Sequence, residues 1–363
     1  MTDSILINSY KKVNLQEVVC AYLGRRKRLR LKKNKRIKGI LIGCIVFAAI
    51  SLIASSSPPS PPKHNPGNFP TYTGFSEISP SKKHFILVGD TQSTSHWEFW
   101  RERNDKERKL IIDEIARREP AFVVHLGDLT TRGSSQKHWQ QFDDLRKELR
   151  GKNIPYFPIL GNHEFYGNDK KSLDYYFGRF PHLKGRRWYS FIWKNIGLIL
   201  LDSNFSTLTK EQIEEQAKWY STELERFERD KSINYVIVCC HEPPFTNSRV
   251  VAPNEKTKMY FADPFIRFSK TCLFFSGHGH TYERFPVEGK FFIVSGGGGG
   301  PRHKVTIDPL KRHYNDLFPG PELRFFHFCE IETKDQGFEL RILRLESDES
   351  FTAADSLTVL GPP

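Results

Sequence analysis

Residues 84–92, HFILVGDTQ, join a short apolar run to a polar end. The run at 84–88 is too short for a helix and rich in β-branched and aromatic residues, which predicts a buried strand. Gly89 and Asp90 follow it directly, and Gln92 comes two residues later. Because ligands of open α/β sheets bind beyond the carboxyl ends of the strands, this stretch predicts a strand that delivers Asp90 to a site.

The same arrangement recurs along the chain. Further apolar runs that predict buried strands lie at 121–124, 156–160, 197–201, 235–239, 272–275 and 291–294. Amphipathic stretches of helical length separate several of these runs, at about 96–118, 135–150 and 209–228. This alternation predicts an α/β fold, and the last two runs, 325–329 and 338–343, predict an antiparallel pair because no long helix separates them.

Polar residues that suit a metal follow five of the strands. They are Asp90 and Gln92, then Asp128, then Asn162 with His163 and Glu164, then His241, and last His278 with His280. Each block alone is as well explained by a structural turn, but five in order are not. Two carboxylates and three histidines exceed the needs of one divalent ion, and one shared carboxylate can bridge two ions. Such a pair of ions complements a phosphate dianion.

The chain resembles the calcineurin-like metallophosphoesterases in five ordered blocks between about residues 84 and 346. The blocks are Asp90-x-Gln92, Gly127-Asp128, Gly161-Asn162-His163-Glu164, His241 and Gly277-His278-Gly279-His280. The continuation through Thr281-Tyr282-Glu283-Arg284 and the glycine run 296–300 are loosely similar to the purple acid phosphatase branch. The resemblance implies a four-layer α/β/β/α sandwich of the metallo-dependent phosphatase type.

The resemblance also implies a role for each site residue. Two divalent ions, drawn from Mn, Fe, Zn or Co, would share Asp128. The first ion would be held by Asp90, Gln92, Asp128 and His280, and the second by Asp128, Asn162, His241 and His278. His163 would donate a proton, and we expect Glu164 to orient its imidazole. The residues that we expect at the phosphate oxygens are Arg132, Tyr166, Tyr282 and Arg284.

Two positions depart from the pattern of the family. Many members have His where Gln92 stands, and an amide oxygen is a weaker ligand than imidazole. The purple enzymes have Tyr three residues after the second Asp, whereas this chain has Thr131. The coloured Fe³⁺–tyrosinate centre should therefore be absent.

The implied function is that of a metal-dependent phosphoric ester hydrolase. Hydroxide held between the ions would attack a phosphomonoester while His163 protonates the leaving group. Two alternatives stay open. The same metals would serve a phosphodiesterase acting on nucleotide or lipid-linked substrates, and a catalytically silent tethered domain would keep the fold without turnover.

The positive charge of the chain is concentrated near its beginning. The net charge is +13, and residues 25–38 alone hold ten Lys and Arg and no acid. From Gly39 onward, 43 basic residues face 40 acidic ones. We therefore expect no general nucleic-acid-binding surface.

Residues 40–57, ILIGCIVFAAISLIASSS, carry no charge and are long enough to span a bilayer as a helix. The basic flank predicts a cytoplasmic N-terminus, which places the catalytic domain outside the cytoplasm as a single-pass membrane protein. The alternative is a cleaved signal and a secreted domain.

The predicted organisation has five parts. They are a basic cytoplasmic segment at 1–39, the membrane helix at 40–57, a Pro-rich linker at 58–80, the phosphoesterase domain at 81–346 and a C-terminal tail at 347–363. Cys239, Cys240, Cys272 and Cys329 lie in strand-like runs, where small buried hydrophobes are the default expectation, although one disulfide stays open.

Overall fold

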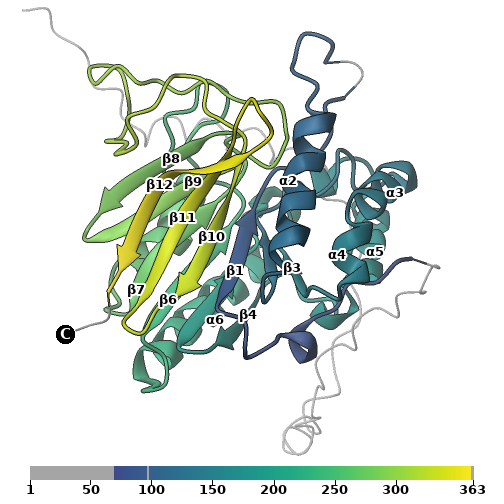
Figure 1. Ribbon diagram of the computed structural model, residues 1–363. Coiled ribbons are helices and arrows are strands. Elements are labelled where there is room, and N and C mark those ends of the chain that lie inside the picture. The colour runs from purple at the N-terminus through teal and green to yellow at the C-terminus, as the bar shows by residue number, and fades with distance from the viewer. Residues whose placement is uncertain (1–68, 96–97, 361–363) are drawn as a thin grey trace, which may run out of the picture. The chain divides into compact units, whose positions relative to one another are not determined.

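The computed structural model describes residues 69–95 and 98–360 and contains two six-stranded sheets (Figure 1). Sheet A has the spatial order β12 (Phe351–Val359), β11 (Phe338–Leu345), β10 (His327–Thr333), β1 (His84–Val88), β2 (Val123–His125) and β3 (Tyr156–Pro158). Sheet B has the order β4 (Tyr189–Trp193), β5 (Ile196–Leu200), β6 (Tyr235–Cys240), β7 (Thr271–Ser276), β9 (Lys290–Ser295) and β8 (Tyr282–Val287). The fold is therefore of the mixed α/β class.

Each sheet contains a group of parallel strands, which lies at one side of sheet A and in the centre of sheet B. In sheet A, β1, β2 and β3 run parallel, and β10 joins β1 from the other side in antiparallel register, with Leu87 opposite Cys329. In sheet B, β5, β6, β7 and β9 run parallel. Parallel strands end at the same edge, so the polar residues that follow them come together.

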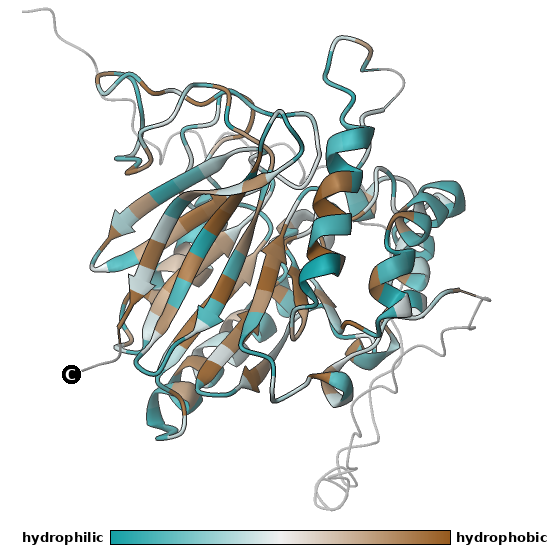
Figure 2. Ribbon diagram, in the orientation of Figure 1, coloured by the Kyte–Doolittle hydropathy of each residue, from teal (hydrophilic) through white to brown (hydrophobic). Residues whose placement is uncertain are grey.

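Helices cover the outer faces of the two sheets. The longer helices are α2 (Asp105–Arg118), α3 (Gln136–Leu145), α5 (Asp169–Arg179) and α6 (Lys210–Arg229), and the five-residue α4 (Lys147–Gly151) follows α3. The short ones are α7 (Glu255–Thr257), the π-turn η5 (Lys258–Ala262), α8 (Asp263–Phe265) and the 3₁₀ turns η1 (Phe75–Glu77), η2 (His163–Phe165), η3 (Pro181–Leu183) and η4 (Phe205–Thr207). Figure 2 shows that hydrophobic residues are concentrated in the strands rather than in the helices.

Two hydrophobic cores separate the layers. The larger core contains α2 residues such as Ile111 and Ile115 together with residues of both sheets, among them Phe85 of β1 and Tyr235 of β6. The second core packs Tyr220, Leu224 and Phe227 of α6 on the outer face of sheet B. Burial of each such aromatic or aliphatic side chain stabilises the fold by about 1.5–3 kcal/mol.

The helices match the predicted stretches with two differences in their bounds. Thr209 accepts from the backbone N–H of Gln212 and forms a capping box with it, so α6 begins where the sequence predicts. The stretch expected as one helix at 135–150 is divided into α3 and α4 at Arg146, whose side chain is buried and donates to Thr91 and Tyr156. The helix expected from 96 begins only at Asp105.

Residues on both sides of the predicted phosphoesterase domain, 81–346, belong to the fold. Tyr72, expected in the linker, is only 4% exposed, and its backbone N–H donates to the Arg179 carbonyl at 2.9 Å. The expected tail contains β12, which pairs with β11 along its whole length. Because β12 is an edge strand, its residues are exposed or only partly buried. Its sequence therefore lacks the apolar run that marks a buried strand and resembles a polar segment.

The predicted membrane helix at 40–57 and the basic segment at 1–39 lie outside the described residues. Within the part of the chain that is described, no helix is both long and apolar enough to cross a bilayer. Cys239, Cys240, Cys272 and Cys329 are free thiols, and all but Cys272 are buried.

Candidate metal centre

Three residues of the site have a backbone conformation that non-glycine residues rarely adopt. Asp90, Asp128 and His278 have φ values of 60°, 56° and 63°, in the left-handed region. Each lies two or three residues after the end of a strand, in the turn that leaves the sheet. Such local strain is concentrated at functional sites, where the surrounding structure fixes it.

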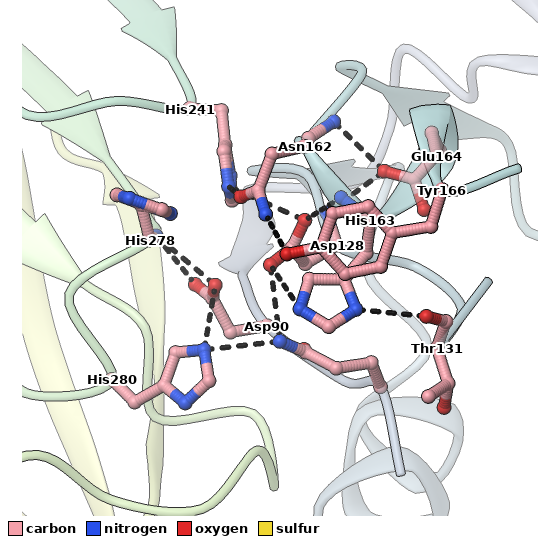
Figure 3. Close-up of polar contacts among 12 residues, drawn as sticks. Asp90, Asp128, Thr131, Asn162, His163, Glu164, Tyr166, His241, His278 and His280 are labelled. Carbon is pink, nitrogen blue, oxygen red and sulfur yellow. Dashed lines mark hydrogen bonds and ion pairs between the residues drawn. The ribbon is translucent and has the colours of Figure 1, made fainter. Parts of the chain in front are cut away.

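Two groups of metal-ligating side chains lie at this edge (Figure 3). One consists of Asp128, His241 and His278, and the other of Asp90, Asp128 and His280. Within each group the ligand atoms lie within 4.8 Å of one another, and Asp128 belongs to both. The structure thus brings together all five of the Asp and His side chains that the sequence predicts as ligands, with Asp128 common to both groups.

The protonation pattern of two histidines fits a cation. The Nδ1 atoms of His241 and His280 lie 2.8 Å from the carbonyls of Leu126 and Pro301, which can only accept. In a neutral imidazole the proton must then be on Nδ1, and Nε2 carries a lone pair. Each Nε2 nevertheless lies 3.3 Å from a carboxylate oxygen, of Asp128 and Asp90 respectively. With neutral imidazoles two acceptors would face each other in each pair, an arrangement that either a metal ion or a second proton on the imidazole would stabilise.

The two predicted amide ligands also lie at the site. The Asn162 Oδ1 is 3.1 Å from His241 Nε2, and its amide nitrogen donates to the Tyr166 hydroxyl at 2.9 Å. The Gln92 amide lies 3.0 Å from both Asp128 and His280. Its Oε1 is buried without a hydrogen-bond partner among the described residues. Rotation of this amide by 180° would exchange its oxygen and nitrogen and place the oxygen between Asp128 and His280.

Two glycines let the strand ends approach this closely. A Cβ on Gly127, which has a φ of +92°, would lie 2.4 Å from the His241 ring. A Cβ on Gly296 would lie 2.7 Å from an Asp90 carboxylate oxygen. Gly296 belongs to the five-glycine run, so this run lies against the site and is not only a flexible turn.

The charges of the centre perturb one another. Burial raises the pKa of Asp128, but the nearby His241, His163 and His278 lower it, to about 2. Burial lowers the pKa of His241, but Asp128 and Asp90 raise it, to about 9. Burial and the nearby His241 lower the pKa of His278 to about 3, and the Asp128 carboxylate offsets only part of this effect.

His163 lies beside Asp128 and is oriented by a backbone carbonyl. Its Nδ1 is 2.9 Å from the Thr131 carbonyl oxygen, and its Nε2 is 3.8 Å from Asp128 Oδ2. The Thr131 hydroxyl donates to the Ser93 carbonyl at 2.9 Å. Figure 3 shows the His163 ring between Asp128 and Thr131.

The expectation that Glu164 orients His163 is wrong. The buried Glu164 carboxylate instead accepts four backbone N–H groups, those of Asp128, Leu129, Thr130 and Gly161, at 2.8–3.2 Å. Burial and the Asp128 carboxylate raise the pKa of Glu164 to about 8, against the opposite effect of these donors. Glu164 therefore positions the loops that carry Asp128 and Asn162.

Of the four candidate phosphate ligands, only two face the open side of the site. Arg132 and Tyr166 line a cavity together with His163. Tyr282 and Arg284 are instead committed to Asp355 of β12, with the Tyr282 hydroxyl 2.7 Å and the Arg284 Nη2 3.3 Å from its carboxylate. Tyr282 is completely buried. The prediction for these two residues is wrong because β8 directs them toward sheet A.

Sequence reasoning missed His303. Its ring stacks on that of His280 at a centroid distance of 4.3 Å, and Arg101 donates to its Nε2 at 2.9 Å. The signal in the sequence was the position of His303, three residues after the end of the glycine run 296–300.

Comparison with known proteins agrees with this geometry. The family model for calcineurin-like phosphoesterases matches residues 83–282, and the chain belongs to that family. Purple acid phosphatase 21 of Arabidopsis thaliana is 28% identical over 263 residues, which is 66% of this chain and 56% of that protein. Tartrate-resistant acid phosphatase type 5 of Sus scrofa is 24% identical over 276 residues, or 67% of this chain and 75% of that one. The similarity to the purple acid phosphatase branch is thus confirmed.

Solved structures show the same fold. The purple acid phosphatase from yellow lupin seeds superposes with a TM-score of 0.58 at 18% identity, covering 77% of this chain and 54% of that one. GAP50, described as the anchor in the inner membrane complex of Plasmodium, gives a TM-score of 0.57 at 16% identity, covering 78% and 90%.

Proposed function

We propose that the chain is a metal-dependent phosphoric ester hydrolase that acts on phosphomonoesters. The observation that carries the proposal is the pair of ligand groups that share Asp128, with His163 beside them. Membership of the phosphoesterase family and the acid phosphatase names of two relatives support it. The mixed nitrogen and oxygen donors suit Mn, Fe, Zn or Co.

Two bound cations would activate water and neutralise charge on the phosphoryl oxygens. Asp90, Gln92, Asp128 and His280 would hold one of them, and Asp128, Asn162, His241 and His278 the other. As the general acid, His163 would act in its imidazolium form, which donates from Nδ1 to the Thr131 carbonyl and can deliver its Nε2 proton to the leaving oxygen. Glu164 fixes the relative positions of the loops that carry Asp128 and Asn162.

The test is an activity panel. The purified protein is stripped with a chelator, reloaded separately with Mn, Zn, Fe or Co, and assayed with p-nitrophenyl phosphate, glycerol 3-phosphate and bis-p-nitrophenyl phosphate. We expect metal-dependent turnover of the two monoesters. Preferential turnover of the diester would reassign the protein as a phosphodiesterase. Absence of turnover with every metal would favour a catalytically silent domain.

We also propose that residues 40–57 anchor the protein in a membrane, with residues 1–39 in the cytoplasm and the phosphoesterase domain outside. The basic residues before this apolar stretch support the orientation. A reporter fused after Pro80 in the full chain should be accessible from outside the cytoplasm. A reporter that is active only in the cytoplasm would refute this topology, and detection of the domain free in the medium would favour the cleaved-signal alternative.

A further inference from the structure

A cavity of about 750 Å³ adjoins the metal centre on the side of His163. Three of its wall residues are shared with the site, namely Thr131, His163 and Tyr166. The imidazole of His163 therefore lines the cavity and also lies beside the Asp128 carboxylate, with Nε2 3.8 Å from Oδ2. None of the five Asp and His ligands that make up the two groups lines this cavity.

This placement determines which part of a substrate the cavity would receive. A general acid must lie within hydrogen-bond reach of the oxygen that it protonates, which is the oxygen of the leaving group. With the phosphoryl group at the metal centre, the leaving alcohol extends from His163 into the cavity. The residues that line the cavity therefore face the leaving group and can select it.

The charged residues of the cavity wall are mostly cationic. Arg101, Arg132 and Lys137 contribute positive charges, and Glu98 is the only acid of the wall. Glu98 is paired with Arg101 at 2.8 Å, so these two charges offset each other. Among the described residues, neither Arg132 nor Lys137 forms an ion pair with a carboxylate, and Arg132 makes only a long contact of 3.5 Å with the Ser134 hydroxyl. Two positive charges thus remain uncompensated on the wall.

The neutral part of the wall is also suited to a polar, hydrogen-bonding group. Hydroxyls of Ser93, Thr94 and Thr131 line the cavity beside the two cations. A concave wall with charges of one sign raises the local potential above that of the same charges on a flat surface. An anion in the cavity would gain charge-assisted hydrogen bonds that a neutral alcohol cannot make.

On the basis of the proposed function, we infer that Arg132 and Lys137 form a specificity site for phosphomonoesters whose leaving group carries a second anionic group. The phosphoryl group to be transferred lies at the metal centre, and the second phosphate or carboxylate lies in the cavity against Arg132 and Lys137. Both residues bind the substrate and do not take part in the proton transfer, which belongs to His163.

The matched pair of substrates for the test is 3-phosphoglycerate and glycerol 3-phosphate, which differ only in a carboxylate against a hydroxymethyl group. We expect kcat/KM to be about tenfold higher for 3-phosphoglycerate at low ionic strength, mainly through KM, because one charge-assisted hydrogen bond has about this value. The ratio should decrease as salt is added. In the double variant R132Q/K137Q the ratio should fall to about one. The control K218Q, which neutralises an exposed lysine of α6, should keep the wild-type ratio.

Turnover of both substrates with equal kcat/KM, or a preference that R132Q/K137Q retains, would overturn the specificity site and leave the proposed function intact. Calorimetry of 3-phosphoglycerate binding to the metal-loaded protein tests the anion site independently of turnover. If no phosphomonoester is turned over, the proposed function fails, whereas tenfold weaker binding in R132Q/K137Q than in K218Q still supports the anion site. Equal binding by these two variants would overturn it.

Discussion

The backbone N–H of Asp128 donates to the Glu164 carboxylate at 3.0 Å, and this bond joins the loop after β2 to the loop after β3. The same carboxylate oxygen accepts the Gly161 N–H at 2.8 Å, while the second oxygen accepts those of Leu129 and Thr130. One buried side chain thus satisfies four donors of two turns that would otherwise lie unpaired in the interior. Glu164 therefore supports the metal centre through the backbone that carries its ligands, and it also interacts electrostatically with the Asp128 carboxylate.

The first prediction concerns this carboxylate. In E164Q the amide nitrogen replaces one oxygen and faces two backbone donors, so we expect the free energy of unfolding to fall by about 2 kcal/mol. Urea denaturation measures the change, with E214Q at an exposed position of α6 as the control. An E164Q protein as stable as E214Q would show that the four hydrogen bonds do not stabilise the fold.

The second prediction concerns metal stoichiometry. Because Asp128 belongs to both ligand groups and His278 to only one, D128A should lose both ions and H278A only one. The affinity of an affected site should fall by at least about 100-fold, since even loss of an outer hydrogen-bond partner costs 10- to 100-fold. Elemental analysis after dialysis measures the ions per chain, beside the exposed-histidine control H313A. Two ions retained by D128A would contradict a bridging carboxylate.

The third prediction tests the proton donor. H163A should lower kcat/KM for glycerol 3-phosphate by about 10²- to 10⁴-fold, because an alkoxide leaves poorly without a proton. The loss should be much smaller for p-nitrophenyl phosphate, whose leaving group is stable as an anion. Steady-state kinetics on both substrates give the comparison. Equal losses would assign His163 to binding or charge stabilisation rather than to proton transfer.

The fourth prediction follows from the position of Tyr72 in the core. Its ring packs against Phe142, Tyr156 and Phe180, so Y72A should lower the free energy of unfolding by about 3–5 kcal/mol. The neighbouring T71A, at an exposed position, is the matched control. A chain truncated to begin at Ser81 should be destabilised at least as much as Y72A. Unchanged stability of that truncated chain would restore the boundary predicted from the sequence.

The fifth prediction concerns acid stability. Burial between the sheets lowers the pKa of His327 to about 4, below its ordinary value of 6.5, so the folded protein binds this proton less well than the unfolded chain. Stability from this residue is present above pH 6.5 and is lost as the pH falls toward 4. Between pH 7 and pH 4, H327Q should lose about 3 kcal/mol less than the wild type. Denaturant titrations at both pH values, with H313Q as the control, measure the difference. Parallel losses would contradict the prediction.

The strands and the candidate metal ligands could be predicted because both leave local signals. An uninterrupted apolar run such as 235–240 is buried on both faces, and its polar end at His241 is determined by strand direction alone. The edge strand β12 lacks such a run, and β8 contains Pro286 and charged residues, so neither was predicted as a strand. Helix α5 was also not predicted.

The errors at the site have a common physical cause. Tyr282 and Arg284 follow His280 closely in the sequence, but their direction is determined by Asp355, which lies more than 70 positions later. The orientation of His163 depends on the backbone carbonyl of Thr131. Because every residue has a backbone carbonyl, the sequence does not indicate which one is the partner. Side-chain type therefore predicts which residues can ligate a metal, whereas backbone partners and long-range contacts are not evident from a motif.

The place of β1 between β2 and β10 has a consequence for biogenesis. The strand that presents Asp90 is translated early, yet its partner on one side is formed by residues 327–333. During synthesis, one edge of β1 therefore stays unpaired until residues 327–333 have emerged from the ribosome. Pairing of such distant segments is slow, and an unpaired strand edge promotes aggregation. We therefore expect the nascent chain to depend on chaperones more than the folded protein does.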